Sequence, residues 1–216
     1  MVARLREISV RFGRRWVLVR LELTFEAGKI FLLTGENGAG KTTLLRLLAT
    51  AIKPTRGEYD LFGYPVRTHL ETLRPRLALI THHNHLYDDL SPLENLDLMA
   101  RLSRGVNQNL MAYLERVGLE EHAHRPVRHF SAGMKRRLCL ARLLLKAPEV
   151  ALLDEPFGQL DPQGVTLVED CIHELHRRGT TLVLSTHDIA RGLALADRHI
   201  KLKSGRLDGP METLRP

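Results

Sequence analysis

The stretch from Gly35 to Thr42 constrains the fold more than any other part of the chain. It reads GENGAGKT and matches the pattern G-x-x-x-x-G-K-[S/T], between an apolar run at 29–34 that predicts a buried strand and a helical run at 41–50. In such a loop the glycines let backbone N–H groups face phosphate oxygens, and the helix that follows adds its positive N-terminal end. The stretch therefore predicts a nucleotide phosphate site; the other interpretation is an ordinary glycine turn. The residues expected to line the site are Gly35, Asn37, Gly38, Ala39, Gly40, Lys41, Thr42 and Thr43.

Two acidic residues supply the carboxylates that a nucleotide site with Mg²⁺ requires. Asp154 ends an apolar strand predicted at 150–154, and we expect it to hold Mg²⁺ together with the hydroxyl of Thr42. Glu155 lies one residue beyond and is placed to polarise the attacking water, while Lys41 reaches the β and γ phosphates of ATP. The alternative is that the two acids merely end a strand.

The composition indicates one folded domain. The 216 residues are 44% hydrophobic and 26% charged, which argues against disorder. Cys139 and Cys171 are too few for a disulfide framework or a four-cysteine zinc site, so a reducing cytoplasm fits. We expect neither export nor a membrane span, because no signal-peptide core opens the chain and no apolar run approaches about 20 residues. The net charge of +7 should attract an anion: a nucleotide, nucleic acid or acidic lipid.

The order of the predicted elements indicates an α/β fold with an inserted helical part. Alternating residues at 5–12 and 21–28 predict antiparallel strands. Between about 84 and 145 the apolar residues recur at helical spacing; a capping box at 91–94 starts one helix, and Gly118 is expected to end the next. The chain then alternates between strand and helix, which predicts a parallel sheet covered by helices. The elements expected there are strands at 77–81, 150–154, 180–185 and around Ile200, with helices from Pro162 and Asp188.

Residues 130–134, FSAGM, provide the link to a known family. They resemble the LSGGQ signature of the nucleotide-binding subunits of ABC transporters, and the resemblance extends over essentially the whole chain. Ala132 and Met134 depart from the signature, whereas Ser131 and Gly133 keep it. The resemblance implies that Ser131 and Gly133 bind a γ-phosphate across a dimer interface; the plainer interpretation is that Ser131 only caps a helix.

The family resemblance also implies a fold: a P-loop ABC-type ATPase cassette in a single domain, 1–216. Its RecA-like nucleotide-binding core would comprise about 1–83 and 146–216, with an N-terminal antiparallel β-subdomain. The α-helical subdomain would be inserted at about 84–145.

Four further residues fall at positions that the family uses. Asp161 lies in a segment that resembles the D-loop, and His187 resembles the switch histidine that contacts the γ-phosphate. Phe12 is the aromatic residue expected to stack on adenine, with Trp16 as the alternative. His82 stands where the family usually has a glutamine that couples Mg²⁺ and water to the helical subdomain. Histidines 82, 83 and 85 could instead form a metal site.

The resemblance to this family implies an ATP-hydrolysing subunit that binds ATP and Mg²⁺ and works as a head-to-tail homodimer. In that arrangement Ser131 and Gly133 of one copy face the γ-phosphate held by Lys41 of the other, while Glu155 and His187 assist the attack of water. The chain itself would be cytoplasmic, bound peripherally to the cytoplasmic face of the bacterial inner membrane, and integral-membrane permease subunits would supply the path across it. No nucleic acid is expected as a partner.

The runs 82–96, 130–137 and 154–157 most resemble the ATP-binding subunit of the bacterial haem exporter of cytochrome c maturation. The alternative is a subunit of another small-molecule or lipid exporter. Two other classes stay open: a nucleic-acid-stimulated ATPase, which the basic charge would explain, and a non-hydrolysing regulatory subunit with a degenerate signature.

Overall fold

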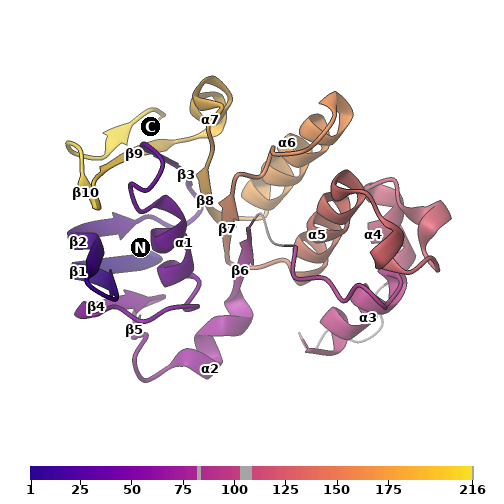
Figure 1. The fold of residues 1–216 in the computed structure, drawn as a ribbon, viewed down its shortest axis with the longest axis horizontal. Coiled ribbons are helices and arrows are strands. Elements are labelled where there is room, and N and C mark those ends of the chain that lie inside the picture. The colour runs from indigo at the N-terminus through magenta and orange to yellow at the C-terminus, as the bar shows by residue number, and fades with distance from the viewer. Residues whose placement is uncertain (82–83, 103–108, 216) are drawn as a thin grey trace.

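The computed structural model describes residues 1–81, 84–102 and 109–215. Two sheets and two groups of helices make up the fold, which Figure 1 shows with the antiparallel sheet on the left and the helical part on the right. The strands are β1 (Ala3–Phe12), β2 (Arg15–Phe25), β3 (Ile30–Thr34), β4 (Arg56–Leu61), β5 (Tyr64–Pro65), β6 (Leu77–Ile80), β7 (Val150–Asp154), β8 (Thr181–Ser185), β9 (Arg198–Lys203), β10 (Arg206–Leu207) and β11 (Glu212–Thr213). The helices are α1 (Lys41–Leu48), α2 (Leu70–Leu73), α3 (Pro92–Leu102), α4 (Leu110–Arg116), α5 (Ala132–Lys146), α6 (Pro162–Arg177) and α7 (Ile189–Leu195), with short 3-10 turns at Arg74–Arg76, Glu120–His122 and Val127–His129.

The N-terminal sheet is antiparallel, in the order β2-β1-β4-β5. Its first two strands confirm the predicted antiparallel pair. Both begin earlier than predicted, and β2 ends at Phe25, three residues before the predicted end; β4 and β5 were not predicted. In β4 only Tyr59 and Leu61 are buried, so its sequence has too short an apolar alternation to stand out. Gly57, which follows the helical run predicted at 41–50, lies inside this strand.

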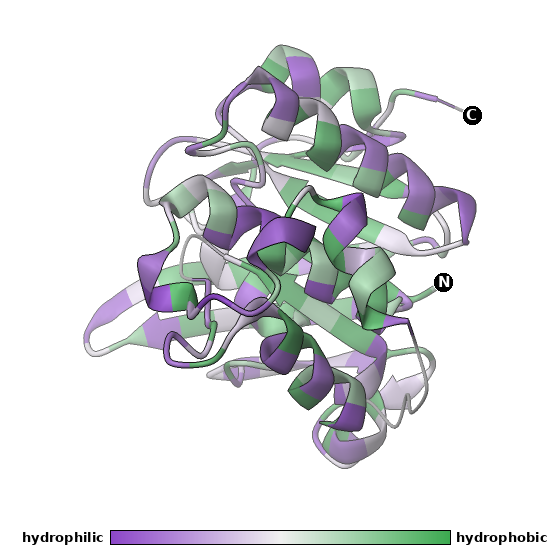
Figure 2. Cartoon of the chain, turned by 90° about the vertical axis from the view of Figure 1, so that its right-hand side faces the viewer, coloured by the Kyte–Doolittle hydropathy of each residue, from purple (hydrophilic) through white to green (hydrophobic). Residues whose placement is uncertain are grey.

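The second sheet carries the strands predicted to be parallel, in the order β10-β9-β3-β8-β7-β6. β3, β7 and β8 lie side by side in its centre, and all their residues are buried. Figure 2 shows these mostly hydrophobic strands between helices, which explains their continuous apolar runs. The parallel strands place their carboxyl ends at one edge of the sheet, where residues 34–35, 154–155 and 185–187 lie at the ends of β3, β7 and β8.

The helical part consists of α3, α4 and α5. The predicted capping box starts α3: the Ser91 N–H donates to Glu94 Oε2 at 2.7 Å, and the Glu94 N–H donates to Ser91 Oγ at 3.3 Å. Gly118 follows the end of α4 with a backbone φ of +66°, as a helix-ending glycine does. Helix α1 ends at Leu48, two residues earlier than predicted. No helix within the described ranges is long and apolar enough to cross a membrane.

Two apolar cores hold these layers together. One joins the antiparallel sheet to α1 and one face of the parallel sheet, where the rings of Phe25 and Phe31 meet edge-on with centroids 4.9 Å apart. The other core joins the opposite face of the parallel sheet to α6 and the helical part, through residues such as Leu138 of α5 and Ile172 of α6. The edge of the sheet that carries the strand ends therefore rests on packed layers on both sides.

Candidate functional site

The predicted phosphate loop connects β3 to α1 and already has the curled shape that phosphate binding requires. Gly40 caps α1 with a φ of +107°, and a Cβ there would lie 2.6 Å from Leu18 Cδ2 and 3.0 Å from the Val17 carbonyl. Only glycine fits this position. The Lys41 ammonium folds back over the loop and donates to the Gly35 carbonyl at 2.6 Å and the Glu36 carbonyl at 3.2 Å. When a phosphate binds, its oxygens can replace the two carbonyls as acceptors of the Lys41 hydrogen bonds.

A cavity of about 300 Å³ lies in front of this loop, at the carboxyl ends of β7 and β8. It brings together most of the predicted phosphate-loop residues with the two predicted carboxylates and the predicted histidine. Val17, which the sequence did not single out, also contributes. The lining residues are Val17, Asn37, Gly38, Gly40, Lys41, Thr42, Thr43, Asp154, Glu155 and His187.

Asp154 is buried at the end of β7, with 4% of its surface exposed. The Ser185 hydroxyl donates to its Oδ1 at 2.6 Å, because the register of β7 and β8 sets these two residues side by side. A short bond to a charged oxygen fixes the carboxylate toward the cavity. Ser185 was not predicted as a site residue, although its place at the end of a buried strand is the kind of signal that could have found it.

Glu155 follows with an uncommon backbone conformation. Its φ is +50°, and its N–H donates to the Ser185 carbonyl at 3.0 Å. Its Oε2 accepts from the His187 N–H at 3.1 Å, and Oε1 lies 3.4 Å from His187 Nε2. Oε1 is buried, and no group in the described ranges forms a hydrogen bond with it. The Glu155 carboxylate therefore has accepting capacity that is not used in this conformation, beside the phosphate loop.

These observations fit bound Mg²⁺ and ATP. Asp154 and the Thr42 hydroxyl supply the oxygen donors that magnesium prefers, and both line the cavity. The loop N–H groups and Lys41 supply positive charge for the phosphates. Glu155 supplies the oxygen that can take a proton.

The signature residues lie elsewhere. Ser131 caps α5, and its hydroxyl accepts from the Met134 N–H at 3.2 Å. Gly133 follows in the first turn of α5, which lies on the other side of β7 from α1 in Figure 1. Asp161 caps α6 and accepts from the Gly164 N–H at 2.7 Å. None of the three lines the phosphate cavity. The structure therefore holds the phosphate loop and the signature in separate places on one chain.

The two candidate aromatic residues differ in position. Phe12 ends β1 and is 52% exposed. Trp16, at the start of β2, lines a second cavity of about 300 Å³, which shares Val17, Asn37 and Gly38 with the first. Trp16 also lies near two arginine side chains, Arg11 and Arg56, each 5.3 Å from its ring centroid. The position of Trp16 favours it for contact with a nucleotide, and a role for Phe12 stays a prediction.

The predicted His82 and its neighbour His83 lie outside the described residues. His85 is described, and its carbonyl accepts from Arg142 Nη1 at 2.8 Å. Within the ranges that the structure describes, no three His, Cys, Asp or Glu side chains could together hold a metal ion.

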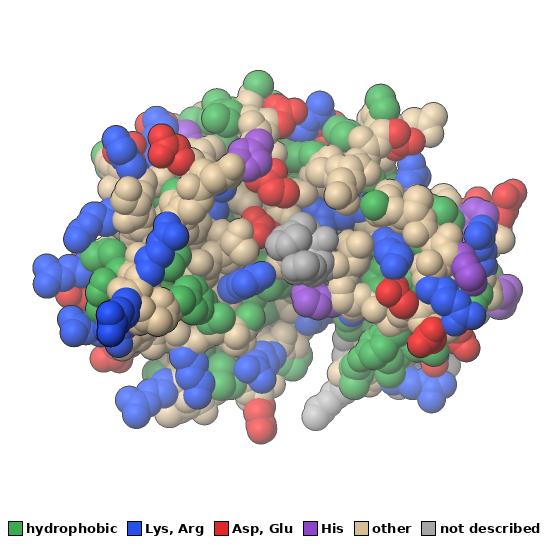
Figure 3. Space-filling model, in the orientation of Figure 1, with side chains coloured by type: hydrophobic (Ala, Val, Ile, Leu, Met, Phe, Trp, Pro, Cys, Tyr) green, Lys and Arg blue, Asp and Glu red, His purple; other side chains and the backbone are tan. Residues whose placement is uncertain are grey.

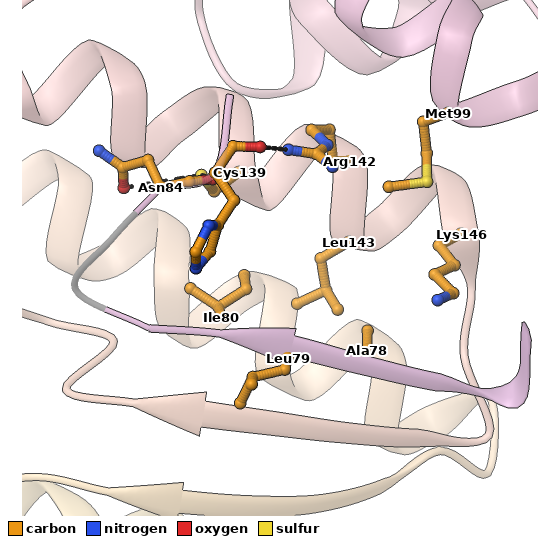
Figure 4. A pocket seen from close by; sticks show the side chains of 10 residues that line it. Ala78, Leu79, Ile80, Asn84, Met99, Cys139, Arg142, Leu143 and Lys146 are labelled. Atoms are coloured by element: carbon orange, nitrogen blue, oxygen red, sulfur yellow. Dashed lines mark hydrogen bonds between the residues drawn. The ribbon is translucent and has the colours of Figure 1, made fainter. Parts of the chain in front are cut away.

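A separate cavity of about 130 Å³ lies between β6 and the helical part (Figure 4). Apolar residues of β6 and α5 line it together with Arg142 and Lys146. Arg142 Nε is buried, and no hydrogen bond to it is found in the described ranges. Burial, reinforced by Arg142, lowers the pKa of Lys146. The lining contains no acidic side chain: it consists of Ala78, Leu79, Ile80, Asn84, His85, Met99, Cys139, Arg142, Leu143 and Lys146.

Comparisons with known proteins agree with this geometry. The sequence model of the ABC transporter family matches residues 18–158. The daunorubicin resistance ATP-binding protein DrrA3 of Streptomyces coeruleorubidus is 37% identical over 201 residues, 91% of this chain and 64% of its own length. The Nod factor export ATP-binding protein I of Burkholderia lata is 36% identical over 205 residues, 93% of this chain and 67% of its own length. The chain thus spans about two thirds of the length of these relatives.

Solved structures are similar over 99% of the chain. A structure described as the ATP-binding subunit of an ABC transporter superposes with a TM-score of 0.91 at 28% identity and is covered over 90% of its length. The ATP-binding cassette MJ0796, solved as a dimer in a post-hydrolysis state with ADP and Pi, has a TM-score of 0.89 at 25% identity and 99% coverage of its own chain. The predicted fold class, an ABC-type cassette, is confirmed by these similarities. The specific resemblance to haem exporters is not supported by the relatives above, which are named for drug resistance and Nod factor export.

Proposed function

Because the chain belongs to the ABC transporter family, we propose that it is the ATP-binding and ATP-hydrolysing subunit of a membrane exporter. The observation that carries the proposal is the single cavity in which Lys41, Asp154, Glu155 and His187 meet. We treat residues 1–216 as one ABC ATPase domain, with its nucleotide-binding core at about 1–83 and 146–216 and its helical subdomain at about 84–145.

The cavity residues divide the chemistry among themselves. Lys41 exchanges its two loop carbonyls for oxygens of the β and γ phosphates. Asp154 and Thr42 would hold Mg²⁺, whose charge neutralises that of the phosphates. The Glu155 carboxylate accepts a hydrogen bond from the attacking water and takes up its proton, and the His187 N–H keeps this carboxylate in place at the cavity.

A second copy of the chain completes each site. Ser131 and Gly133 lie at the start of α5, outside the cavity, so their backbone N–H groups and the serine hydroxyl are available to a nucleotide held by another copy. A head-to-tail pair would close two ATP molecules between its halves. That the similar cassette MJ0796 was solved as a dimer, bound to ADP and Pi, supports pairing of two copies. Loss of the γ-phosphate removes the shared contact and lets the halves separate.

Permease subunits in the membrane would use this motion. We place their contact at the cavity between β6 and α5, which joins the nucleotide-binding core to the helical part (Figure 4). Its apolar lining with two cations and no acid suits a single acidic side chain that an amphipathic helix of the permease would insert toward Arg142 and Lys146. This contact would put the chain on the cytoplasmic face of the bacterial inner membrane.

The cargo proposed is a small molecule or lipid moved outward, since relatives over nine tenths of this chain are named for daunorubicin resistance and Nod factor export. Haem export for cytochrome c maturation is a second candidate, supported by the run 82–96, HHNHLYDDLSPLENL. Deletion of the gene separates the two: loss of all covalent haem in c-type cytochromes favours haem export, and normal cytochromes with increased drug sensitivity favour the first.

Two variants test the ATPase itself. Glu155→Gln should abolish turnover while an ATP-bound dimer accumulates in size-exclusion chromatography, because the site closes without hydrolysis. Lys41→Ala should weaken MgATP binding and give no dimer. Identical behaviour of the two variants would contradict the assigned roles. A wild-type chain without Mg²⁺-dependent turnover would favour the regulatory alternative, and turnover that DNA or RNA raises in a salt-sensitive way would favour the nucleic-acid alternative. On the face drawn in Figure 3, Lys and Arg side chains are spread over the antiparallel sheet. DNA or RNA would be expected to bind to this surface in the nucleic-acid test.

A further inference from the structure

Arg136 lies in the second turn of α5 with a buried guanidinium group, 5% exposed. Every nitrogen of the group donates to a main-chain carbonyl. Nη1 donates to Thr81 at 2.8 Å, Nη2 to Glu155 at 2.5 Å and to Asp154 at 3.4 Å, and Nε to Pro156 at 3.2 Å. Burial lowers the pKa of Arg136. A buried cation persists only where such bonds replace the lost water.

The arrangement of acceptors explains why an arginine stands here. Three of them belong to consecutive residues, 154–156, and their carbonyls converge because Glu155 has a φ of +50°. A residue with a side chain rarely adopts this conformation. The fixed fork of a guanidinium can hold several carbonyls at once, whereas the single nitrogen of a lysine cannot span them. The bond to Glu155 therefore stabilises the backbone turn that aims its carboxylate.

Glu155 is thus held from three directions. The Ser185 carbonyl accepts from its N–H, the His187 N–H donates to its carboxylate, and Arg136 donates to its carbonyl. Arg136 differs from the other two because it comes from α5, the helix that begins at the signature residues. Its fourth acceptor, Thr81, directly follows β6 at the edge of the helical part. One side chain therefore connects the signature helix, the end of β6 and the backbone of Glu155.

We propose that Arg136 is a positioning residue that fixes Glu155 for water activation and couples it to the signature helix. The proposal rests on the proposed ATPase function. In the proposed dimer, Ser131 contacts the γ-phosphate of the ATP bound by the partner, while Glu155 acts on the γ-phosphate of the ATP bound by its own chain. Arg136 then transmits a shift of α5, caused at one nucleotide, to the carboxylate at the other.

The first test separates positioning from general stability. Arg136→Met and Arg136→Lys are compared with Arg116→Gln, which removes another arginine that ties the helical part to the core, through an ion pair with Glu174 on α6. Both Arg136 variants should have a kcat about tenfold to a hundredfold lower than wild type. Their KM and their calorimetric Kd for MgATP should stay within about twofold of the wild-type values. Arg116→Gln should keep both kcat and KM.

A kcat for Arg136→Lys equal to that of the control, or a parallel loss of kcat and MgATP binding, would overturn the proposal. If Arg136→Met does not fold, the lysine variant decides, because it keeps the charge. Wild-type turnover and its loss in Glu155→Gln test the ATPase function alone. A wild-type chain without turnover removes both proposals, whereas an active wild type with an equally active Arg136→Lys removes only this one.

The second test measures coupling. Ser131→Ala and Arg136→Lys are combined in one chain, and kcat is compared with the two single variants. Coupled residues lose less in the double variant than the product of the single losses, as expected for groups that act as a unit. Strictly multiplicative losses would mean that Arg136 positions Glu155 without a link to the signature, and the coupling part of the proposal would be discarded.

Discussion

Substituting Gly205 with alanine should destabilise the phosphate loop through a contact that lies far from it in sequence. Gly205 lies in the turn between β9 and β10, where its N–H donates to the Ala39 carbonyl at 3.0 Å and its carbonyl accepts from the Val19 N–H at 2.8 Å. Its φ is +77°, and a Cβ would lie 2.3 Å from the Val17 carbonyl oxygen. Alanine there requires both an unfavourable backbone conformation and a displacement of Val17 or of the turn.

The two costs can be separated with a second glycine. Gly63 has nearly the same φ, +82°, but no atom within 4 Å of a Cβ. Gly63→Ala should therefore lose only the conformational term, about 1–2 kcal/mol in the free energy of unfolding. Gly205→Ala adds the cost of overpacking, about 1–3 kcal/mol, for a total of about 2–5 kcal/mol. The effect of the added methyl on the unfolded chain is common to both variants and cancels in the comparison.

Urea denaturation gives both free energies, and calorimetry gives the Kd for MgATP. Gly205→Ala should be the less stable variant and should also bind MgATP more weakly, because Ala39 belongs to the phosphate loop and Val17 lines its cavity. Gly63→Ala should bind MgATP like wild type. Equal losses of stability in the two variants would refute the argument, since the close contact would then carry no energy.

Three further changes have defined outcomes. Hydrogen bonds from Ser91 lower the pKa of Glu94, so the capping box stabilises the fold fully above pH 4.5 and loses this contribution as the pH falls through the lowered pKa. In an acid denaturation experiment, Glu94→Gln should remove the loss of stability that wild type shows below pH 4.5. Burial and the nearby Arg142 lower the pKa of Lys146, so its positive charge opposes folding, and wild-type stability should rise with pH between this lowered pKa and the unfolded value of 10.5. Lys146→Met should be more stable than wild type at pH 7 and should lack the rise. Urea denaturation at pH 7 and near pH 10.5 measures both effects. Asn95→Ala should cost about 2–4 kcal/mol in the same assay, because this buried side chain forms four hydrogen bonds with the segment 87–91 that precedes α3.

The parts of the fold that the sequence could predict are those that local patterns determine. The phosphate loop, the carboxylates after β7 and the capping box at Ser91 each depend on residues within one turn or strand end. The parallel strands β3, β7 and β8 were equally clear, because a strand buried on both faces is apolar throughout. Strand β4 was missed because it is buried on one side only and over two residues.

The choice between Phe12 and Trp16 shows where local reasoning ends. β1 and β2 pair antiparallel, with Arg11 opposite Trp16 and Phe12 opposite Arg15. The register shifts three times along this pair, the last between Val10 and Arg11. A shift of one residue exchanges the faces of a strand, so the direction of both aromatic side chains depends on irregularities that no residue spacing reveals.

The same limit applies to the catalytic carboxylate, and it explains how the proposed mechanism is built. Glu155 could be identified from its neighbours in sequence, but its orientation depends on a carbonyl of β8, the N–H of His187 and the guanidinium of Arg136. These groups come from three segments that meet only in the folded chain. Arg136 belongs to α5, the helix that Ser131 caps. Its hydrogen bond to Glu155 therefore connects the carboxylate that would activate water in one site to the serine that would contact the phosphate in the other. A dimer with this connection would be expected to hydrolyse its two nucleotides in concert, which isolated half-sites could not do.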